Sequence, residues 1–117
     1  MPQIFVETNQ SLASLRARRG LGTALTERVA VLLGVPEDQC LVALEPGRHL
    51  AMDGSDEPCA LLELDARHLP RAQTPHMVAE LSDVLHQSLD IAYSRIIVQI
   101  SDPAGQAAQE LARERRR

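Results

Sequence analysis

The stretch VLLGVPEDQCLVALEP, residues 31–46, decides the fold, because one fixed displacement of the sequence along itself aligns it with QSLDIAYSRIIVQISD, residues 87–102. The same displacement aligns IFVETN (4–9) with ALLELD (60–65). Self-similarity over this length indicates that one supersecondary unit is used twice. The two halves of the chain are therefore expected to fold alike.

Each half is predicted to hold one amphipathic helix between two strands. Apolar residues recur at every fourth position, which places them on one face of a helix. They are Leu21, Leu25, Val29 and Leu33 in the first half, and Met77, Leu81, Leu85 and Leu89 in the second. Short runs rich in strand-forming residues flank both helices, at 3–8, 40–45, 59–65 and 95–101. Each half then forms a βαβ unit, whose two strands must be parallel.

Two such units predict an α/β (α+β) fold with a four-stranded mixed sheet and both helices on one face. We expect a single domain over residues 1–117, with pseudo-repeats at about 2–52 and 58–103 and a variable tail at 104–117. The strands at 40–44 and 96–100 are apolar at nearly every position, which is typical of strands covered on both faces. Because the helices cover only one face, other copies of the chain are expected to cover the second.

Composition excludes several classes of partner. The chain has 117 residues, a formal net charge of -4, one Phe, one Tyr and no Trp, so it lacks the aromatic side chains that stack on nucleic-acid bases. The basic run at 113–117 is interpreted as a solvated tail. Neither a long apolar span nor a secretory signal is evident, which predicts a cytoplasmic protein without membrane contact. Cys40 and Cys59 have no second cysteine nearby and are expected to be buried free thiols.

Common motif-borne chemistries are absent from the sequence. It has no phosphate-binding glycine loop, no nucleophile-elbow motif and no zinc-binding helix motif. His76, Glu80, Asp83 and His86 lie on the second helix opposite the Leu stripe, where a solvated face explains them better than a metal site. We therefore predict no metal and no cofactor.

Pro2 is the residue with the most informative position. Proline at the start of a strand is tolerated for structural reasons alone. If Met1 is removed, however, Pro2 becomes a secondary amine at a buried strand end. An α-amino group has a pKa of ~8 in water, and burial disfavours its protonated form. A free base at neutral pH is the expected result, which makes Pro2 a candidate general base.

Three segments resemble the macrophage migration inhibitory factor family of the tautomerase superfamily, over about residues 1–102. They are MPQIFVETN, LLGVPEDQCLVALEPG and, most specifically, MDGSDEPCALLELDARHL. The resemblance implies a homotrimer that uses its terminal proline as a base. It also implies keto–enol tautomerisation of phenylpyruvate-like α-keto acids, with dopachrome-like substrates in the same class.

The resemblance carries over to the pocket only in part. Pro2 aligns with the catalytic proline, but Val35 stands where the family has a lysine that holds the substrate carboxylate. Ile97 and Gln99 stand in place of a tyrosine and an asparagine. Arg67 falls at a pocket position that is normally apolar, where its guanidinium could replace the missing lysine; a solvated surface arginine is the alternative.

Three functions therefore remain open. The first is a tautomerase, in which neutral Pro2 moves a proton, Arg67 holds an acidic group and Gln99 binds the carbonyl or enol oxygen. The second keeps the fold but uses a protonated proline beside arginine for decarboxylation or hydration of short acids. The third is a non-catalytic trimer that binds a protein partner, which the loss of the lysine, tyrosine and asparagine favours.

Overall fold

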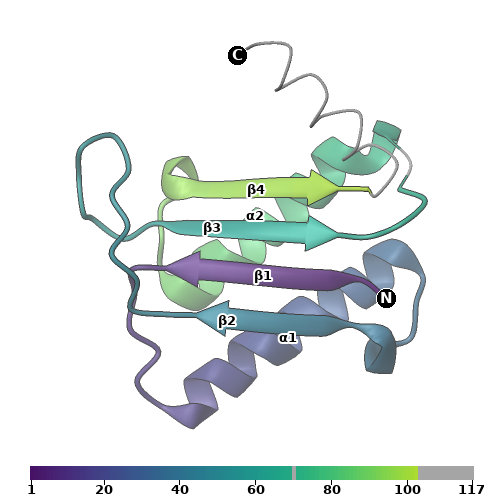
Figure 1. Ribbon diagram of the computed structural model, residues 1–117, viewed down its shortest axis with the longest axis horizontal. Helices are drawn as coiled ribbons and strands as arrows, with labels where there is room; N and C mark the ends of the chain where they lie inside the picture. The colour runs from purple at the N-terminus through teal and green to yellow at the C-terminus, as the bar shows by residue number, and fades with distance from the viewer. Residues whose placement is uncertain (70, 103–117) are drawn as a thin grey trace.

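The computed structural model describes residues 1–69 and 71–102, and its elements follow the predicted order in both halves (Figure 1). The predicted tail, residues 104–117, lies outside the described residues. The strands and helices are β1 (Gln3–Thr8), α1 (Leu15–Leu33), β2 (Leu41–Glu45), β3 (Ala60–Asp65), α2 (Thr74–Leu89) and β4 (Ile96–Ser101). Short 3-10 turns precede β2, α2 and β4.

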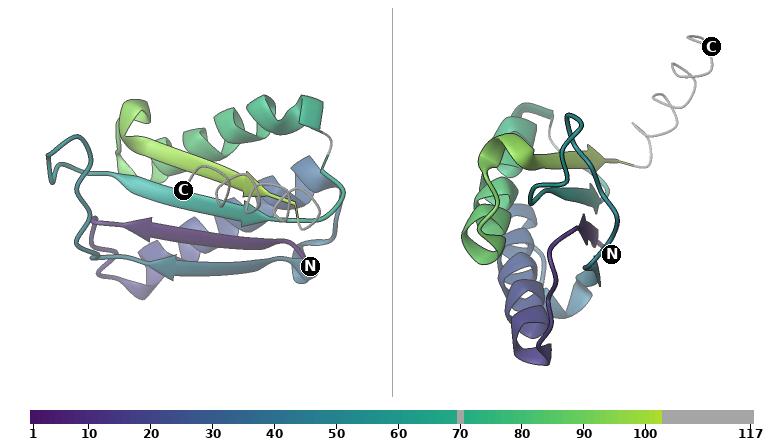
Figure 2. Two further views of the ribbon diagram at one scale, coloured as in Figure 1. Left: turned by 45° about the horizontal axis from the view of Figure 1, so that its top comes forward. Right: turned by 90° about the vertical axis from the view of Figure 1, so that its left-hand side faces the viewer.

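The sheet is mixed, as predicted, with the strand order β2-β1-β3-β4. β1 is parallel to β2, and β3 is parallel to β4, so each half is a βαβ unit. The halves meet through the antiparallel pair of β1 and β3. Both helices cover the same face of the sheet, as the right-hand view of Figure 2 shows. The predicted four-stranded α+β architecture is therefore confirmed.

The helical stripes form the core together with alternate residues of the strands. Every residue of both stripes is buried except Leu33, which is partly buried and packs against the core. Burial of such side chains stabilises the fold by about 1.5–3 kcal/mol each. On the sheet, Ile4 and Val6 face the helices and are buried, whereas the intervening Phe5 is 39% exposed. The alternation shows that the helices cover only one face of β1.

The two helices also end alike, which extends the repeat to the level of backbone conformation. Gly34 closes α1 in the left-handed region at φ 66°, and its N–H donates to the carbonyl of Ala30. Asp90 closes α2 in the same region at φ 54°, and its N–H donates to the carbonyl of His86 over 3.0 Å. Glycine adopts this conformation without a steric cost, and aspartate is among the few other residues that enter it routinely.

Residues 1–69 and 71–102 leave the second face of the sheet open. Phe5, Leu41 and Ile97 are each between 39% and 46% exposed on this face, beside carboxylates such as Glu7 and Glu63. The described residues thus do not supply the predicted cover on both faces. Over the described residues, none of the helices combines the length and apolar character that crossing a membrane requires.

Asn9 and Arg95 fix the loop at 46–59, which lies at the end of the sheet where β1 and β2 finish (Figure 1). The Asn9 amide donates to the carbonyls of Asp56 and Glu57 over 3.0 and 2.9 Å, and accepts from the N–H of Cys59. The Arg95 guanidinium donates to carbonyls of the same loop over 3.0–3.1 Å; the acceptors are Met52, Ser55, Glu57 and Pro58. We call this region the loop end of the sheet.

Candidate active site

Pro2 lies buried at the opposite end of the sheet, immediately before β1. Its carbonyl accepts a hydrogen bond of 3.0 Å from the N–H of Leu41, the first residue of β2. Met1, by contrast, is 76% exposed. The proline is therefore held by the sheet, while the residue ahead of it is exposed. We call this region the proline end of the sheet.

Arg67 belongs to the same end because β1 and β3 are antiparallel. Gln3 pairs with Asp65 in the register of the two strands, so Pro2 comes opposite Ala66 and Arg67 follows one residue later. The Arg67 side chain is exposed, and it forms no hydrogen bond or ion pair with any other residue that the structure describes. The fold thus places the predicted base and the predicted cation at the same end of the sheet.

The turn that carries Arg67 is fixed by two hydrogen bonds to the end of β4. The N–H of Ala66 donates to the carbonyl of Ser101 over 3.0 Å, and the N–H of Leu69 donates to Asp102 Oδ2 over 3.1 Å. Between them, His68 adopts a left-handed backbone with φ 61°. Sequence reasoning missed Asp102, although its place directly after the last strand of the parallel pair β3 and β4 puts it at this end of the sheet.

Val35 also lies near the proline end, where α1 finishes and β2 begins (Figure 1). Its N–H donates to the carbonyl of Ala30 over 3.1 Å as part of the helix cap, and its side chain is half-buried. The Val35 side chain carries no charge and therefore cannot form an ion pair with a carboxylate. If a cation at this end serves the substrate, Arg67 is a better candidate than the residue at the helix end.

The two cysteines differ in their burial. Cys59 is buried, as predicted, but Cys40 is only half-buried, because it lies in the turn between α1 and β2 rather than inside the strand. Burial raises the pKa of the Cys40 thiol above its ordinary value, and the nearby carboxylates of Glu37 and Asp38 raise this pKa further. The terminal ammonium lowers it, which places Cys40 near the start of the chain.

Ile97 and Gln99 do not join Pro2 within one chain. Both point to the open face of β4, the edge strand separated from β1 by β3. Gln99 pairs with Glu63 and, through it, lies in the row of Phe5, whereas Ile97 lies in the row of Glu7. With a strand rise of ~3.3 Å per residue and a spacing of ~4.8 Å between strands, Gln99 lies roughly 14 Å from Pro2 and Ile97 roughly 19 Å. A second copy of the chain would have to bring them to the base.

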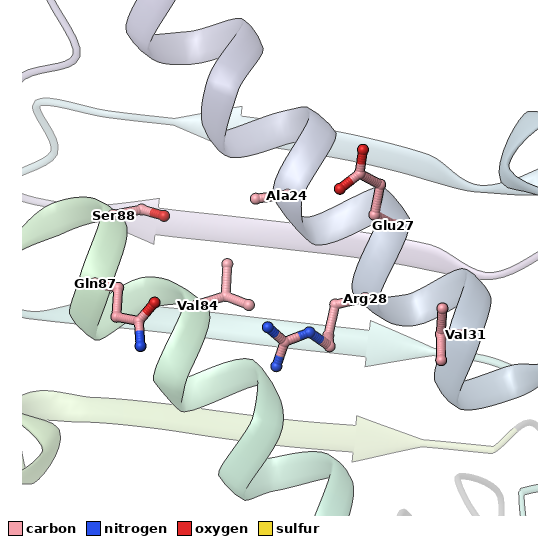
Figure 3. Close-up of a pocket in the computed structure, with 7 residues that line it drawn as sticks. All are labelled: Ala24, Glu27, Arg28, Val31, Val84, Gln87 and Ser88. Carbon is pink, nitrogen blue, oxygen red and sulfur yellow. The ribbon is translucent and has the colours of Figure 1, made fainter.

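Two hollows formed by described residues lie away from Pro2. One of about 260 Å³ lies between α1 and α2 and is drawn in Figure 3. Arg28 extends across it and pairs with Glu80, so its charge is already engaged. Another, of about 280 Å³, lies on the open face of the sheet beside Phe5, Glu7 and Glu63. Neither is lined by Pro2 or Arg67.

The polar residues of α2 mostly have partners in the structure. Glu80 pairs with Arg28, and Asp83 accepts a hydrogen bond of 2.6 Å from the Tyr93 hydroxyl, which raises the pKa of Tyr93. The His86 ring stacks on Tyr93, and its Nδ1 lies 2.7 Å from the carbonyl of Ile91. Among the residues the structure describes, no group of three or more His, Cys, Asp or Glu could hold a metal ion.

Comparison with known proteins identifies a family for the chain. The profile of a family described as macrophage migration inhibitory factor (MIF) matches residues 1–109. The chain belongs to this family. A D-dopachrome decarboxylase from Gallus gallus is 30% identical over 96 residues, which cover 80% of this chain and 81% of that protein. A D-dopachrome decarboxylase from Mus musculus is 41% identical over 58 residues, so the match spans about half the length of each protein.

Solved structures of the family have the same fold. The homologue from Prochlorococcus marinus superposes with a TM-score of 0.77 at 25% identity, covering 86% of this chain and 87% of its own. The protein from Trichinella spiralis gives a TM-score of 0.79 at 19% identity, covering 86% of this chain and 88% of its own. The resemblance predicted from the MDGSDEPCALLELDARHL segment is therefore confirmed at the level of family and fold.

Proposed function

We propose that the chain is a tautomerase that uses the ring nitrogen of Pro2 as its general base. After removal of Met1, this nitrogen takes a proton from the carbon next to the carbonyl of a phenylpyruvate-like α-keto acid and returns the proton at the other end of the enol. Dopachrome-like acids belong to the same substrate class. The observation that supports this most is the buried position of Pro2 at a sheet end that also carries Arg67.

Arg67 is proposed to bind the substrate carboxylate. A guanidinium presents two parallel N–H groups to a carboxylate, and such charged hydrogen bonds are stronger than neutral ones. A cation close to Pro2 also disfavours protonation of the amine, which helps to keep it in the basic form. The same residue therefore serves binding and catalysis, and it takes over from the lysine that Val35 replaces.

A homotrimer is proposed to complete the site. The open sheet face exposes Phe5, Leu41 and Ile97, which a neighbouring copy would cover. A strand β4 from that copy would bring Gln99 to the proline end, where its amide hydrogen-bonds the carbonyl or enol oxygen. Val35 and Ile97 would then line the pocket with apolar surface, which suits the ring of an aryl substrate better than a small polar acid.

Decarboxylation is the second candidate, because the two curated relatives described above are both named D-dopachrome decarboxylases. The same residues would hold the substrate, with Arg67 near the carboxylate that leaves as CO₂. A protonated Pro2 would then stabilise the developing negative charge and supply the proton that replaces the lost carboxylate. The two reactions thus differ in the charge that Pro2 must carry.

The test is a pH profile of the protein from which Met1 has been removed. A general base must be unprotonated, so kcat/KM for enol–keto interconversion of phenylpyruvate should rise with pH through the Pro2 pKa and then level off. A falling limb with release of CO₂ from a dopachrome-type acid would favour decarboxylation. No turnover in either assay would move the assignment to the non-catalytic trimer.

A further inference from the structure

The turn from Ala66 to Leu69 is strained at one residue and anchored on both sides of it. His68 is one of three non-glycine residues with positive φ in the described part of the chain, together with Asp53 and Asp90. Asp90 closes a helix, and Asp53 lies in the tight turn beside Gly54. His68 neither closes a helix nor lies in a tight turn beside a glycine. A side chain in this region costs roughly 1 kcal/mol or more, and the conformation persists only where surrounding contacts impose it.

Three contacts impose it here. Ala66 is bonded to Ser101 through its N–H, and the Leu69 side chain packs against the core. The third contact is the hydrogen bond of 3.1 Å from the Leu69 N–H to Asp102 Oδ2. Ala66 and Leu69 are thus fixed before and after the strained residue. Arg67, which lies between them, has its backbone direction set by both anchors.

The chemistry of Asp102 makes this arrangement unexpected for a carboxylate-binding site. A negative charge at the proline end repels an acidic substrate and competes for Arg67. An aspartate at this place needs a compensating role, and the hydrogen bond from the Leu69 N–H gives it one, because that bond holds the turn that carries Arg67.

We infer that Asp102 is a positioning residue, which holds the Ala66–Leu69 turn so that Arg67 is directed to the substrate carboxylate beside Pro2. The inference rests on the proposed function and adds a determinant of specificity for acids to it. Asp102 does not touch the substrate. Its contribution should appear only with substrates that have a free carboxylate and only while Arg67 is present.

The test is a double-mutant cycle of Asp102→Ala with Arg67→Ala, assayed on phenylpyruvate and on its methyl ester. Loss of one hydrogen bond should raise KM for the acid about fivefold to tenfold in Asp102→Ala. The same change should have less than about a twofold effect in the Arg67→Ala background, or on the ester, because no carboxylate is then held. kcat should change little in either case.

Two variants separate position from charge. Asp102→Asn keeps an oxygen acceptor for the Leu69 N–H and removes the charge, so KM for the acid should stay the same or fall. Asp65→Asn removes a carboxylate from the same end of the sheet without touching the turn. The ratio of KM for the ester to KM for the acid should stay as in the wild type. A rise in KM with Asp102→Asn equal to that of Asp102→Ala would overturn the inference.

Amide exchange of Leu69 gives a readout independent of turnover. It should accelerate in Asp102→Ala and keep its wild-type rate in Asp102→Asn; equal rates in all three proteins contradict the anchoring. If the wild-type protein turns over, but the effects of Asp102→Ala and Arg67→Ala simply add, the inference fails and the proposed function stands. If the wild-type protein does not turn over phenylpyruvate, the proposed function fails. The double-mutant cycle is then measured as phenylpyruvate binding. Equal affinities in the wild type, the two single variants and the double variant would overturn the inference.

Discussion

The loop end and the proline end of the sheet differ in how their polar groups are used. At the loop end, the side chains of Asn9 and Arg95 form hydrogen bonds with backbone groups of the loop at 46–59. At the proline end, Arg67 is exposed and uncommitted to any described residue, beside a buried Pro2. The difference indicates that one end of the sheet secures the fold, while the other keeps a cation and a potential base available for a ligand.

The largest expected effect is on stability, at the loop end. Arg95→Ala removes hydrogen bonds to four carbonyls, and bonds from a charged donor contribute about 1.5–3 kcal/mol each, although they do not add fully. Water can reach part of the loop and replace some of them. We expect the free energy of unfolding to fall by about 2–4 kcal/mol in urea denaturation at one fixed protein concentration.

Arg28→Ala is the matched control for this loss. Arg28 is also an arginine with a defined partner, Glu80, but its ion pair is one-third exposed and should contribute no more than about 1 kcal/mol. Equal losses for Arg28→Ala and Arg95→Ala would show that the loop end is not specially secured. Arg95→Lys should recover little of the lost free energy of unfolding, because one ammonium cannot reach four carbonyls.

The next effect concerns activity, at the proline end. Arg67→Ala should lower kcat/KM for phenylpyruvate by a factor that corresponds to about 1.5–3 kcal/mol, the usual value of a charged hydrogen bond, and leave stability nearly unchanged. Val35→Lys in the Arg67→Ala background should restore part of the activity if the new ammonium reaches the pocket. Unchanged kinetics in Arg67→Ala would return this residue to the solvated surface.

A smaller effect comes from the comparison of the two helix ends. Asp90→Gly places in α2 the residue that closes α1, which relieves the left-handed backbone and removes a negative charge from the C-terminal end of the helix. We expect a gain of about 0.5–1 kcal/mol in the free energy of unfolding. Asp90→Asn should give part of this gain, and a loss in both variants would mean that the carboxylate has another role.

The smallest expected effect is on the reactivity of Cys40. Since burial and the carboxylates of Glu37 and Asp38 raise its pKa, its thiolate fraction at neutral pH is lower than that of an ordinary cysteine. Alkylation should be slow near pH 7 and continue to accelerate above the pH at which a free thiol levels off. The double change Glu37→Gln and Asp38→Asn should accelerate it a few-fold at pH 7, as followed by peptide mass spectrometry; an unchanged rate would leave burial as the sole cause.

Much of the fold could be predicted because it is periodic. The repeat aligned the strands, and the stripes at every fourth residue identified the buried helix faces, of which only Leu33 is less buried than expected. Placing Arg67 beside Pro2 followed from the family pattern, and the antiparallel register of β1 and β3 supplies its physical reason. The family and fold were therefore readable from residue order alone.

The remaining features left no periodic signal. Asn9 and Arg95 act through hydrogen bonds to carbonyls far away in the sequence, which any polar residue in a loop could make or fail to make. Asp102 acts on a turn more than thirty residues earlier in the chain. Cys40 looked buried because apolar residues follow it, yet it precedes the strand instead of belonging to it. Ile97 and Gln99 require the assembly, which a single sequence does not describe.

The most direct measurement compares two preparations that differ only in whether a residue precedes Pro2. A free N-terminal proline is a secondary amine, whereas retained Met1 converts the same nitrogen to an amide that accepts no proton at neutral pH. Both preparations should fold and assemble alike, since Met1 is exposed. The account predicts that enol–keto turnover of phenylpyruvate is at least about 100-fold faster in the protein without Met1. Equal turnover in the two preparations would contradict it.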